Sequence, residues 1–433
     1  DMSLTVTAAD AVTLKSHSSN SFLSGEKAYI DVTAPSLTVG NDGSGVIDGN
    51  VKFTRTNTTD DYRVAVGESE SSNTQAALTG MTYSETVNAK YLNIQPGTPE
   101  NTDPDDKVTN YGITVAMNHG EAIEVTSKNC GNILGNDYTN GKLTYDPDTH
   151  TLTGKGSFGG MKVEITSDDQ VDVVLSNANG TVVNGNLTVT GAQDVEVTGV
   201  SSTALITEDA TITCAGDILM DNAGSGNVLG YTRGYHGNLD VVSARNVTIH
   251  GVGRTGTDED ENNYTIYGRA KIDCSGDVEI TSQNGGAVWD PVVIANADNV
   301  TITAKQRAIW DSRGEEDSSI NCSGKVEITS ETTAALYEGD LKIDGATNVT
   351  ISGKRDREAT VGGNVTITCS GPVVLENKGS GNAVSGELKY TPDPTKPYEI
   401  KAGTDAADAA SKEPVATKEE GGTFSETVDA SYI

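Results

Sequence analysis

Aromatic and acidic residues recur at one position of a repeated segment, and they offer the clearest chemistry in the chain. Both tryptophans of the protein and two tyrosines form the aromatic set: Tyr267, Trp289, Trp310 and Tyr337. Three of these rings are followed directly by an acid: Asp290, Asp311 and Glu338. Aromatic faces stack on the apolar C–H faces of sugars, and carboxylates accept hydrogen bonds from sugar hydroxyl groups. Rings that face solvent would therefore bind a polysaccharide or a host glycan.

A structural role for the same rings is the alternative. Val183 and Ile206 stand at the corresponding position of other repeats, and aliphatic residues there indicate partial burial. A ring stack that only stabilises the fold would bind nothing. The direction in which the rings point separates the two interpretations.

Catalysis is a second alternative for this region. Asp290 and Asp311 are one repeat apart, close to the separation of about 5 Å between the carboxylates of retaining glycosidases. Four arginines near them could serve a lyase: Arg254, Arg269, Arg307 and Arg313. The sequence holds no phosphate-binding glycine loop, nucleophile elbow or metal motif, and its five histidines are scattered. We therefore assign no catalytic residue and expect a binding protein.

The charge of the chain limits its partners. It carries 30 Lys and Arg against 62 Asp and Glu, a net charge of −32. Such a surface repels nucleic acid and anionic membranes, and no apolar run is long enough for a membrane helix. The acidic run Asp258–Glu261 could give oxygens to Ca²⁺, but it lacks the spacing of an EF-hand loop. We expect a solvated acidic loop there, and no cofactor.

Repeated segments must position these residues. When the repeated segments are aligned with one another, two aliphatic positions, two residues apart, recur in each of them. The first position holds Val12, Leu37, Val171, Val195, Ile218, Val247, Val278, Val300, Val326, Val349 and Val373. The second holds Leu14, Val39, Val173, Val197, Met220, Ile249, Ile280, Ile302, Ile328, Ile351 and Leu375. A period of two predicts a strand with both positions facing a core.

A third aliphatic position directly precedes the aromatic one. It holds Phe22, Val46, Val182, Leu205, Leu229, Ile266, Val288, Ile309, Leu336, Thr360 and Val384. Each repeat is thus predicted to contain about three short strands. No single repeat can bury its apolar side, but stacked coils form one continuous core, which explains folding with only 35% hydrophobic residues. At about 4.8 Å per coil, the four rings would span about 15 Å.

Four of the five cysteines fall at the same turn of alternate repeats: Cys214, Cys274, Cys322 and Cys369. Small residues take that position in the intervening repeats: Gly191, Ser243, Asn296 and Gly345. Cysteines two coils apart are separated by about 9.6 Å, beyond the limit of about 7 Å for a disulfide. We expect buried free thiols that serve as small apolar side chains.

This pattern resembles the right-handed parallel β-helix of the pectate-lyase-like class, over roughly residues 1–50 and 161–387. The resemblance implies an all-β solenoid of about 8–9 coils in the main unit, with β-rich caps, preceded by the last coils of another unit. It also implies a fold that often hosts polysaccharide lyases and glycoside hydrolases. It implies no particular activity for this chain.

Two passages look like copies of one cap, namely 51–94 and 388–433. The first passage contains YRVAVG and YSETVNAKY, and the second contains the similar segments YEIKAG and FSETVDASY. Open ends of a solenoid expose sheet edges and need such covers. The expected organisation is therefore first-unit coils over 1–50, their β cap over 51–96, a linker over 97–110, an opening β cap over 111–160, the parallel β-helix over 161–387 and a closing β cap over 388–433.

The opening segment 111–154 is similar to segments of large secreted repeat proteins of Gram-positive gut bacteria. This resemblance implies an extracellular, surface-associated location and no catalytic residue. The leading expectation is a non-catalytic surface or adhesin-type protein that binds polysaccharide along the aromatic column. A polysaccharide lyase or hydrolase and a purely structural spacer are the alternatives.

Overall fold

The computed structural model describes residues 3–17, 19, 28–70, 72–97, 108–231, 236–254, 263–311, 317–418 and 422–433. The fold is an all-β solenoid of about 15 turns, with 55% of the chain in strands and one short helix among the described residues. The chain divides into two units, Asp1–Val108 and Thr109–Ile433. Phe22 and most of the expected linker lie outside the described residues.

The first unit combines parallel coils with an antiparallel cover. Its parallel strands are β1 (Ser3–Thr7), β2 (Val12–Ser16), β3 (Tyr29–Ala34), β4 (Leu37–Asn41) and β5 (Ile47–Arg55). Four antiparallel strands cover them: β6 (Tyr62–Ser69), β7 (Ser72–Ala77), β8 (Thr82–Ala89) and β9 (Tyr91–Pro96). β8 pairs with β5, and β9 lies between β4 and β6. The cover therefore pairs with the last parallel strand of each of the two sheets in this unit.

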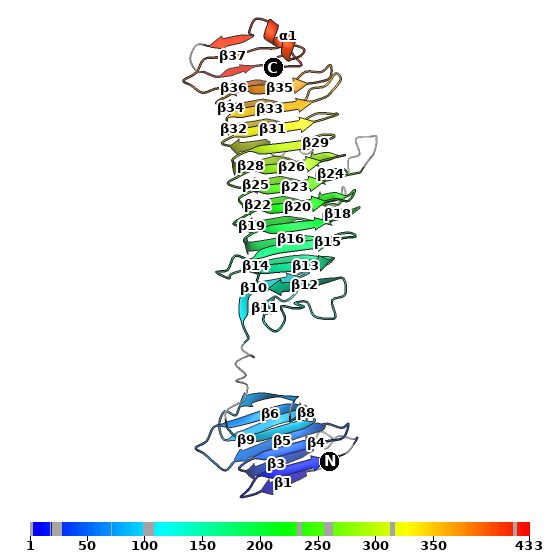
Figure 1. The fold of residues 1–433 in the computed structure, drawn as a ribbon, viewed down its shortest axis with the longest axis vertical. Helices are drawn as coiled ribbons and strands as arrows, with labels where there is room; N and C mark the ends of the chain where they lie inside the picture. The colour runs from blue at the N-terminus through cyan, green and yellow to red at the C-terminus, as the bar shows by residue number, and fades with distance from the viewer. Residues whose placement is uncertain are drawn as a thin grey trace. The chain divides into compact units, whose positions relative to one another are not determined.

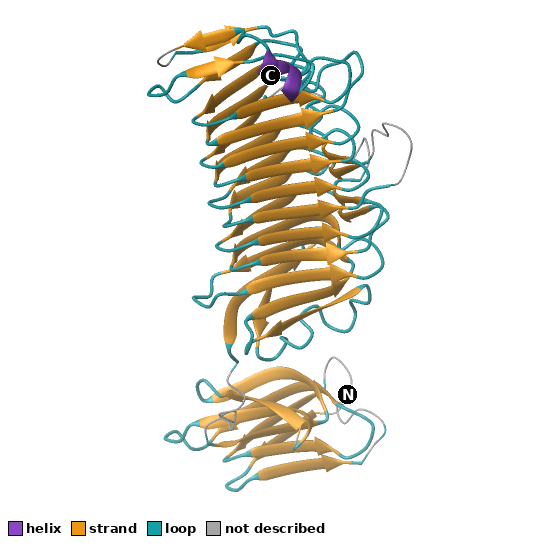
Figure 2. Ribbon diagram, turned by 45° about the horizontal axis from the view of Figure 1, so that its top comes forward, coloured by secondary structure: helices purple, strands orange, loops and turns teal. Residues whose placement is uncertain are grey.

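The second unit is built on two long sheets whose strands run across the stack of coils (Figures 1 and 2). The first sheet carries the two aliphatic positions read from the sequence. Its strands, in order, are β12 (Gly141–Asp146), β13 (Thr151–Gly156), β15 (Asp172–Asn177), β17 (Val195–Gly199), β20 (Ile218–Asn222), β23 (Val247–Gly251), β26 (Val278–Ser282), β29 (Val300–Ala304), β31 (Lys325–Ser330), β33 (Asn348–Gly353) and β35 (Val373–Asn377). From β13 onward every neighbouring pair is parallel.

The second sheet includes the shorter strands that lead to the aromatic position. Its strands are β10 (Asn110–Met117), β11 (Ile123–Thr126), β14 (Phe158–Ile165), β16 (Val183–Ala192), β18 (Ala204–Ile206), β19 (Ala210–Cys214), β21 (Asn227–Leu229), β22 (Leu239–Ser243), β24 (Tyr264–Ile266), β25 (Ala270–Asp273), β27 (Gly286–Val288), β28 (Val292–Ala297), β30 (Ser318–Cys322), β32 (Leu341–Ala346), β34 (Val365–Cys369), β36 (Leu388–Thr391) and β39 (Phe424–Glu426). The pairs at its two ends, β10 with β11 and β14, and β36 with β39, are antiparallel.

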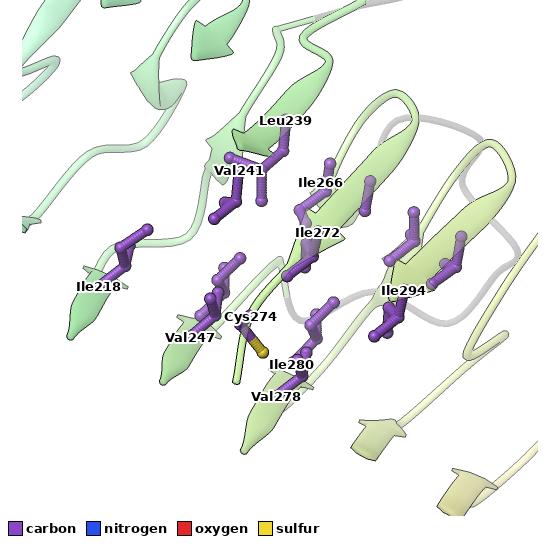
Figure 3. Packing of buried hydrophobic residues seen from close by; sticks show 14 of the residues in the cluster. Ile218, Leu239, Val241, Val247, Ile266, Ile272, Cys274, Val278, Ile280 and Ile294 are labelled. Carbon is purple, nitrogen blue, oxygen red and sulfur yellow. The ribbon is translucent and has the colours of Figure 1, made fainter. Parts of the chain in front are cut away.

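The core runs without interruption through this second unit. Ile218, Val247 and Val278 come from successive coils and face the interior, with Cys274 among them (Figure 3). All four are almost completely buried. Because each coil buries its apolar face only against its neighbours, the stack forms a single hydrophobic core.

The register differs from the sequence alignment at one coil. Val173 pairs with Val195, and Leu175 pairs with Val197. The expected alignment of Val171 with Val195 is therefore wrong by two residues. The turn before β15 is longer than in later coils, and a repeat period alone does not reveal that length.

The cysteine position also needs a correction. Cys214 pairs with Ala192, Cys322 with Ala297 and Cys369 with Ala346, so buried alanines alternate with buried cysteines. The alignment had placed Gly191, Asn296 and Gly345 at this position. Each directly precedes one of these alanines, and their φ angles are positive, at 80°, 61° and 81°. They are extra residues of β-bulges, where glycine and asparagine tolerate the left-handed region.

Side-chain oxygens hold the turn that leads into the first sheet. Asp194 accepts a hydrogen bond from the backbone N–H of Asp217 at 2.6 Å, and Asn246 accepts one from Asp277 at 2.9 Å. Asn299 continues the series by accepting from the N–H of Lys325 at 2.8 Å. These bonds link successive coils, because each side chain reaches the turn of the next coil.

Both ends of the second unit carry caps. At the opening, β12 and β13 form the antiparallel hairpin expected around the Asp-Pro-Asp turn. At the close, β37 (Tyr398–Ile400) pairs with β38 (Ala416–Lys418), and helix α1 (Ala406–Ser411) lies between them in the chain. The helix was not expected in a β cap. Its N-cap is Asp405, whose side chain accepts from the N–H of Asp408, and alanine favours the helix.

Candidate functional site

The four predicted rings lie one coil apart on the outer side of the second sheet. Each follows an inward-facing residue, and these residues pair in series from Ile266 through Val288 and Ile309 to Leu336. Because side chains alternate along a strand, the next residue points away from the core. The column of Tyr267, Trp289, Trp310 and Tyr337 is therefore correctly aligned.

The aliphatic neighbours cited for burial belong to a different column. Val183 pairs with Ile206, Ile206 pairs with Leu229, and Leu229 pairs with Ile266, so these residues face the core. The earlier alignment, with Val182, Leu205 and Thr360 in the inward column, is wrong by one residue at those coils. The true neighbours of the rings are small or polar: Asn184, Thr207, Gly230, Gly362 and Ser385.

The rings nevertheless form a cluster of their own, outside the main core. Tyr267 is fully buried and Trp289 is 5% exposed, whereas Trp310 and Tyr337 are half-buried. Tyr264, which the sequence did not single out, completes the cluster. Its ring lies over the backbone of Gly286 in the next coil, where a Cβ atom would come within 2.2 Å of it. Among the described residues of this cluster, Trp310 and Tyr337 are therefore the rings with the most accessible surface.

The rings are not coplanar. Tyr267 and Trp289 have centroids 4.9 Å apart at 32°, and Trp289 and Trp310 are 4.1 Å apart at 51°. Trp310 and Tyr337 meet edge to face, 5.4 Å apart at 83°. Aromatic rings in tilted or edge-to-face contact attract each other more strongly than rings stacked directly face to face. The accessible surface is therefore a corner formed by two rings, and it covers only part of the column of four rings identified in the sequence.

Two of the three predicted acids are buried. Asp290 is 3% exposed and Asp311 is 2% exposed. The Asp290 carboxylate lies 3.6 Å from Nδ1 of His236, whose ring stacks on Tyr267 at 5.1 Å. Glu338 is exposed and accepts a hydrogen bond from Nε1 of Trp310 at 3.4 Å. Among the three acids, Glu338 is the one placed to contact a ligand.

Arginines hold the exposed end of the cluster. The guanidinium carbon of Arg307, a residue only 3% exposed, lies 4.4 Å from the ring centroids of both Trp310 and Tyr337. Arg355 lies 5.3 Å from the Tyr337 centroid and forms an ion pair with Glu358. Guanidinium groups are attracted to aromatic faces, more strongly where water is excluded. These contacts fix the orientation of Trp310 and Tyr337 before any ligand binds.

A cavity of about 470 Å³ opens beside Tyr337 and Glu338. Its other lining residues are Arg357, Glu358, Ala359, Gly362, Ser380, Gly381, Asn382 and Ser385. Gly362 occupies the ring position of the next coil, and a Cβ atom there would lie 2.0 Å from the carbonyl oxygen of Tyr337. Glycine at this position therefore lets the backbone of one coil pack closely on the backbone of Tyr337 in the coil before it.

A second cavity of about 510 Å³ lies toward the other end of the same column. Asn184 and Thr207, which occupy the ring position of earlier coils, line it together with Tyr231. Tyr231 is 41% exposed. Separate cavities therefore lie at the ring position on the two sides of the aromatic cluster.

The sequence missed the arginines and the acid that line the open end. Arg355, Arg357 and Glu358 lie in the charged segment KRDRE, which follows β33 in the coil after Tyr337. The charge of this segment is visible in the sequence, but its position beside Tyr337 of the preceding coil is a tertiary relationship.

The burial of Asp290 and Asp311 bears on the catalytic alternative. Among the described residues, both carboxylates are almost fully covered, so neither is presented at the surface. Among the four arginines considered for a lyase, Arg307 is engaged with two rings, and Arg313 lies outside the described residues. The acidic run Asp258–Glu261, considered for Ca²⁺, also lies outside them.

The buried thiols have an inert environment. Cys214, Cys274, Cys322 and Cys369 are buried and free, as expected. Burial raises the pKa of each thiol, and that of Cys214 to about 11. Within the described ranges, no three His, Cys, Asp or Glu side chains are grouped so that they could hold a metal ion.

Among the described residues, no helix is long and apolar enough to cross a membrane. No protein-family model, no curated protein and no solved structure matches this chain.

Proposed function

We propose that this chain is a non-catalytic, extracellular surface protein that binds polysaccharide at the open end of its aromatic cluster. The observation that carries the proposal is the corner formed by Trp310 and Tyr337 beside the 470 Å³ cavity. The corner offers ring surface for a sugar face. Glu338, Ser380 and Asn382 offer hydrogen-bonding groups to its hydroxyls.

Preorganisation supports a binding role. Arg307 touches both rings, and Glu338 accepts from Trp310, so the exposed side chains are held in place without a ligand. A site whose side chains are already fixed loses less conformational entropy on binding. Half-buried rings beside a polar cavity favour sugars over purely apolar ligands, because a sugar presents both C–H faces and hydroxyls.

The finer features of the fold belong to the same proposal. We infer a right-handed parallel β-helix of the pectate-lyase-like class, with about 8–9 coils in the main unit. The support is the unbroken parallel pairing from β13 to β35. Strand crossovers within parallel sheets are strongly biased to the right hand. The acidic composition and the resemblance of the opening segment support a bacterial cell-surface location.

Tryptophan fluorescence tests the binding proposal. A panel of neutral and acidic plant polysaccharides and mucin glycans is titrated into the native chain. We expect at least one to change the emission saturably. Tyr337→Ala should weaken that binding about tenfold or more, corresponding to about 1.4 kcal/mol. Tyr29→Ala is the matched control, because Tyr29 is 43% exposed and lies in the other unit.

The same titration separates the alternatives. Release of reducing ends or of unsaturated products during incubation would establish a hydrolase or lyase and refute the non-catalytic assignment. Absence of binding across the panel, by fluorescence and by affinity electrophoresis, would leave the ring cluster with a structural role and the chain as a spacer.

A further inference from the structure

The cavity of about 510 Å³ beside Tyr231 differs in its chemistry from the cavity beside Tyr337. Hydroxyls, one amide, one carboxylate and one aromatic ring line it, from Ser157, Thr181, Asn184, Thr203, Thr207, Glu208 and Tyr231. Among the described residues, this lining includes no cation, whereas Arg357 lines the cavity beside Tyr337. Small-molecule sites typically have volumes of about 300–1,000 Å³, so this cavity has the size of such a site.

Hydrogen bonds fix the polar side chains that two successive coils place in this cavity. The Thr207 hydroxyl accepts a hydrogen bond from the N–H of Gly185 at 2.8 Å and donates one to Oδ1 of Asn184 at 3.3 Å. The amide of Asn184 is thereby oriented with its oxygen toward Thr207. Its N–H donors make no hydrogen bond to any described residue, and the side chain is exposed. The amide nitrogen of Asn184 is therefore available to donate to a ligand.

A row of hydroxyls forms a second polar wall of the cavity. The Oγ1 atoms of Thr181 and Thr203 lie 3.2 Å apart, and Oγ1 of Thr203 lies 3.2 Å from Oγ of Ser201. Ser201 is fully buried, and its hydroxyl also accepts a hydrogen bond from the N–H of Thr203 at 3.2 Å. The row is thus anchored in the interior of the coil. Side chains that are already held in place lose little conformational entropy when a ligand binds.

Glu208 and Tyr231 add a charge and a ring to these polar walls. Glu208 is half-buried, and its carboxylate forms neither an ion pair nor a hydrogen bond with any residue that the structure describes. Such a carboxylate accepts hydrogen bonds from hydroxyls and repels other anions. Tyr231 is 41% exposed, so its ring is accessible to the apolar C–H face of a sugar. The cavity therefore combines a ring surface with hydrogen-bond donors and acceptors for hydroxyl groups.

This cavity is separate from the corner formed by Trp310 and Tyr337. The inward-facing residues that precede the ring position pair in series over five coil steps from the coil of Thr207 to that of Tyr337: Ile206, Leu229, Ile266, Val288, Ile309 and Leu336. At about 4.8 Å per coil, the two positions are about 24 Å apart. A small sugar in one cavity therefore does not touch the other.

We propose that this cavity is a second saccharide site, independent of the Trp310–Tyr337 corner, and that it binds a neutral sugar. The Tyr231 ring packs on the C–H face of the sugar, the Asn184 amide donates to one of its hydroxyl oxygens, and Glu208 accepts from another hydroxyl. Glu208 also selects against sugars that carry a carboxylate, because the described lining offers no cation to separate the two negative charges.

Nuclear magnetic resonance of the full ¹⁵N-labelled chain tests this proposal. The probes are glucose, galactose, mannose and N-acetylglucosamine at millimolar concentration. We expect at least one of them to cause saturable shifts of the amide signals of Gly185, Thr207 and Glu208. The uronic acids of the three hexoses are the matched controls, since they differ only in the carboxylate at C6, and they should cause no such shifts. The proposal is overturned if no neutral sugar shifts these signals, or if the hexoses and their uronic acids act alike.

Three variants assign the roles within the site. Tyr231→Ala should weaken binding of the neutral sugar about tenfold, whereas Tyr231→Phe, which keeps the ring, should bind as the native chain does. Glu208→Gln should allow the uronic acid to bind, a change that a merely structural role of Glu208 would not produce. Unchanged affinity in Tyr231→Ala would contradict the assigned contact of the ring with the sugar.

The two saccharide sites can fail separately in these experiments. Tyr337→Ala should leave the shifts at Gly185 and Thr207 unchanged, because the corner is about five coils of about 4.8 Å away. Tyr231→Ala should leave the response of the tryptophan emission to polysaccharide unchanged. Loss of both responses in either variant would show one shared site and refute the independence of the second.

Discussion

Trp289 and Trp310 stand one coil apart with ring centroids 4.1 Å from each other, yet one is buried and the other is half-exposed. The boundary between the structural and the accessible part of the aromatic column therefore falls between two adjacent tryptophans. Because they are the only tryptophans in the chain, this boundary can be measured optically.

Acrylamide quenching should distinguish the two tryptophans. Trp289→Phe retains Trp310, so its emission should be quenched efficiently. Trp310→Phe retains only Trp289, so its emission should shift to the blue and its Stern–Volmer constant should fall several-fold. Equal quenching of the two variants would contradict the burial difference. Circular dichroism of both variants controls for loss of fold.

Arg307 should contribute to stability through the rings. Arg307→Ala removes a nearly buried guanidinium from two aromatic faces, and should cost about 2 kcal/mol. Arg307→Lys should lose less, because a cation remains near the rings. The midpoint of urea unfolding, with its slope, gives the change.

Arg245→Ala is the control for this prediction. Arg245 forms a two-bond pair with Asp217 on the exposed surface, at 2.8 and 2.6 Å. Exposed ion pairs contribute little to stability, so the midpoint should hardly move. If Arg245→Ala lowered the urea midpoint as much as Arg307→Ala, the contact of Arg307 with the two rings would add nothing to stability.

The buried cysteines should make stability fall at alkaline pH. Burial raises the pKa of the Cys214 thiol from its ordinary value of 9.0 to about 11. Between these values the unfolded chain loses a proton that the folded chain keeps, so the unfolded state is favoured as pH rises. The free energy of unfolding should decline from about pH 9 to pH 11, and Cys214→Ala should reduce the decline.

The same burial should suppress thiol chemistry in the native state. At pH 8, a thiol reagent should modify the half-buried Cys130 and leave Cys214, Cys274, Cys322 and Cys369 unreacted until urea is added. The count of modified thiols by mass spectrometry gives the result. Rapid modification of all five thiols in the native protein would contradict the burial of these four cysteines.

The bulge position should discriminate between glycine, asparagine and alanine. Gly345 has φ of 81°, and a Cβ atom there would lie 2.9 Å from the carbonyl oxygen of Cys322. Gly345→Ala should therefore cost about 1–2 kcal/mol. Gly345→Asn should cost less, because Asn296 already adopts a φ of 61° at the equivalent bulge. Melting temperatures of the two variants give the comparison.

Much of the fold follows from the sequence because the solenoid repeats one local rule. Each coil directs two aliphatic residues, two positions apart, toward the core, as Val247 and Ile249 are directed in theirs. The spacing of two reveals the strand, and its recurrence along the chain reveals the stack of coils. The errors occur where coils differ in length. The bulges at Gly191 and Asn296 add one residue, and the longer turn before β15 shifts Val173 by two.

The site was less predictable than the fold. The alignment identified the column of Trp289 and Trp310 correctly, but a linear sequence does not show how far neighbouring loops and side chains cover a ring. Arg307 precedes Trp310 by three residues, and its stacking on Tyr337 of the next coil is a tertiary contact. The cavity beside Tyr337 is lined by residues of three successive coils, among them Glu338, Glu358 and Ser380, and a linear sequence does not show that they converge.

The alternation of alanine and cysteine has a consequence for how such a chain can lengthen or shorten. Cysteines in the native stack are two coil steps apart, about 9.6 Å. Removing a single coil, such as the one that contains Ala297, would place Cys322 directly above Cys274 at about 4.8 Å, within the range of a disulfide. Removing two coils together would preserve the alternation. Deleting a single coil that contains a cysteine would also leave the remaining thiols apart, so among single-coil deletions only the loss of an alanine-containing coil would bring two thiols within disulfide range.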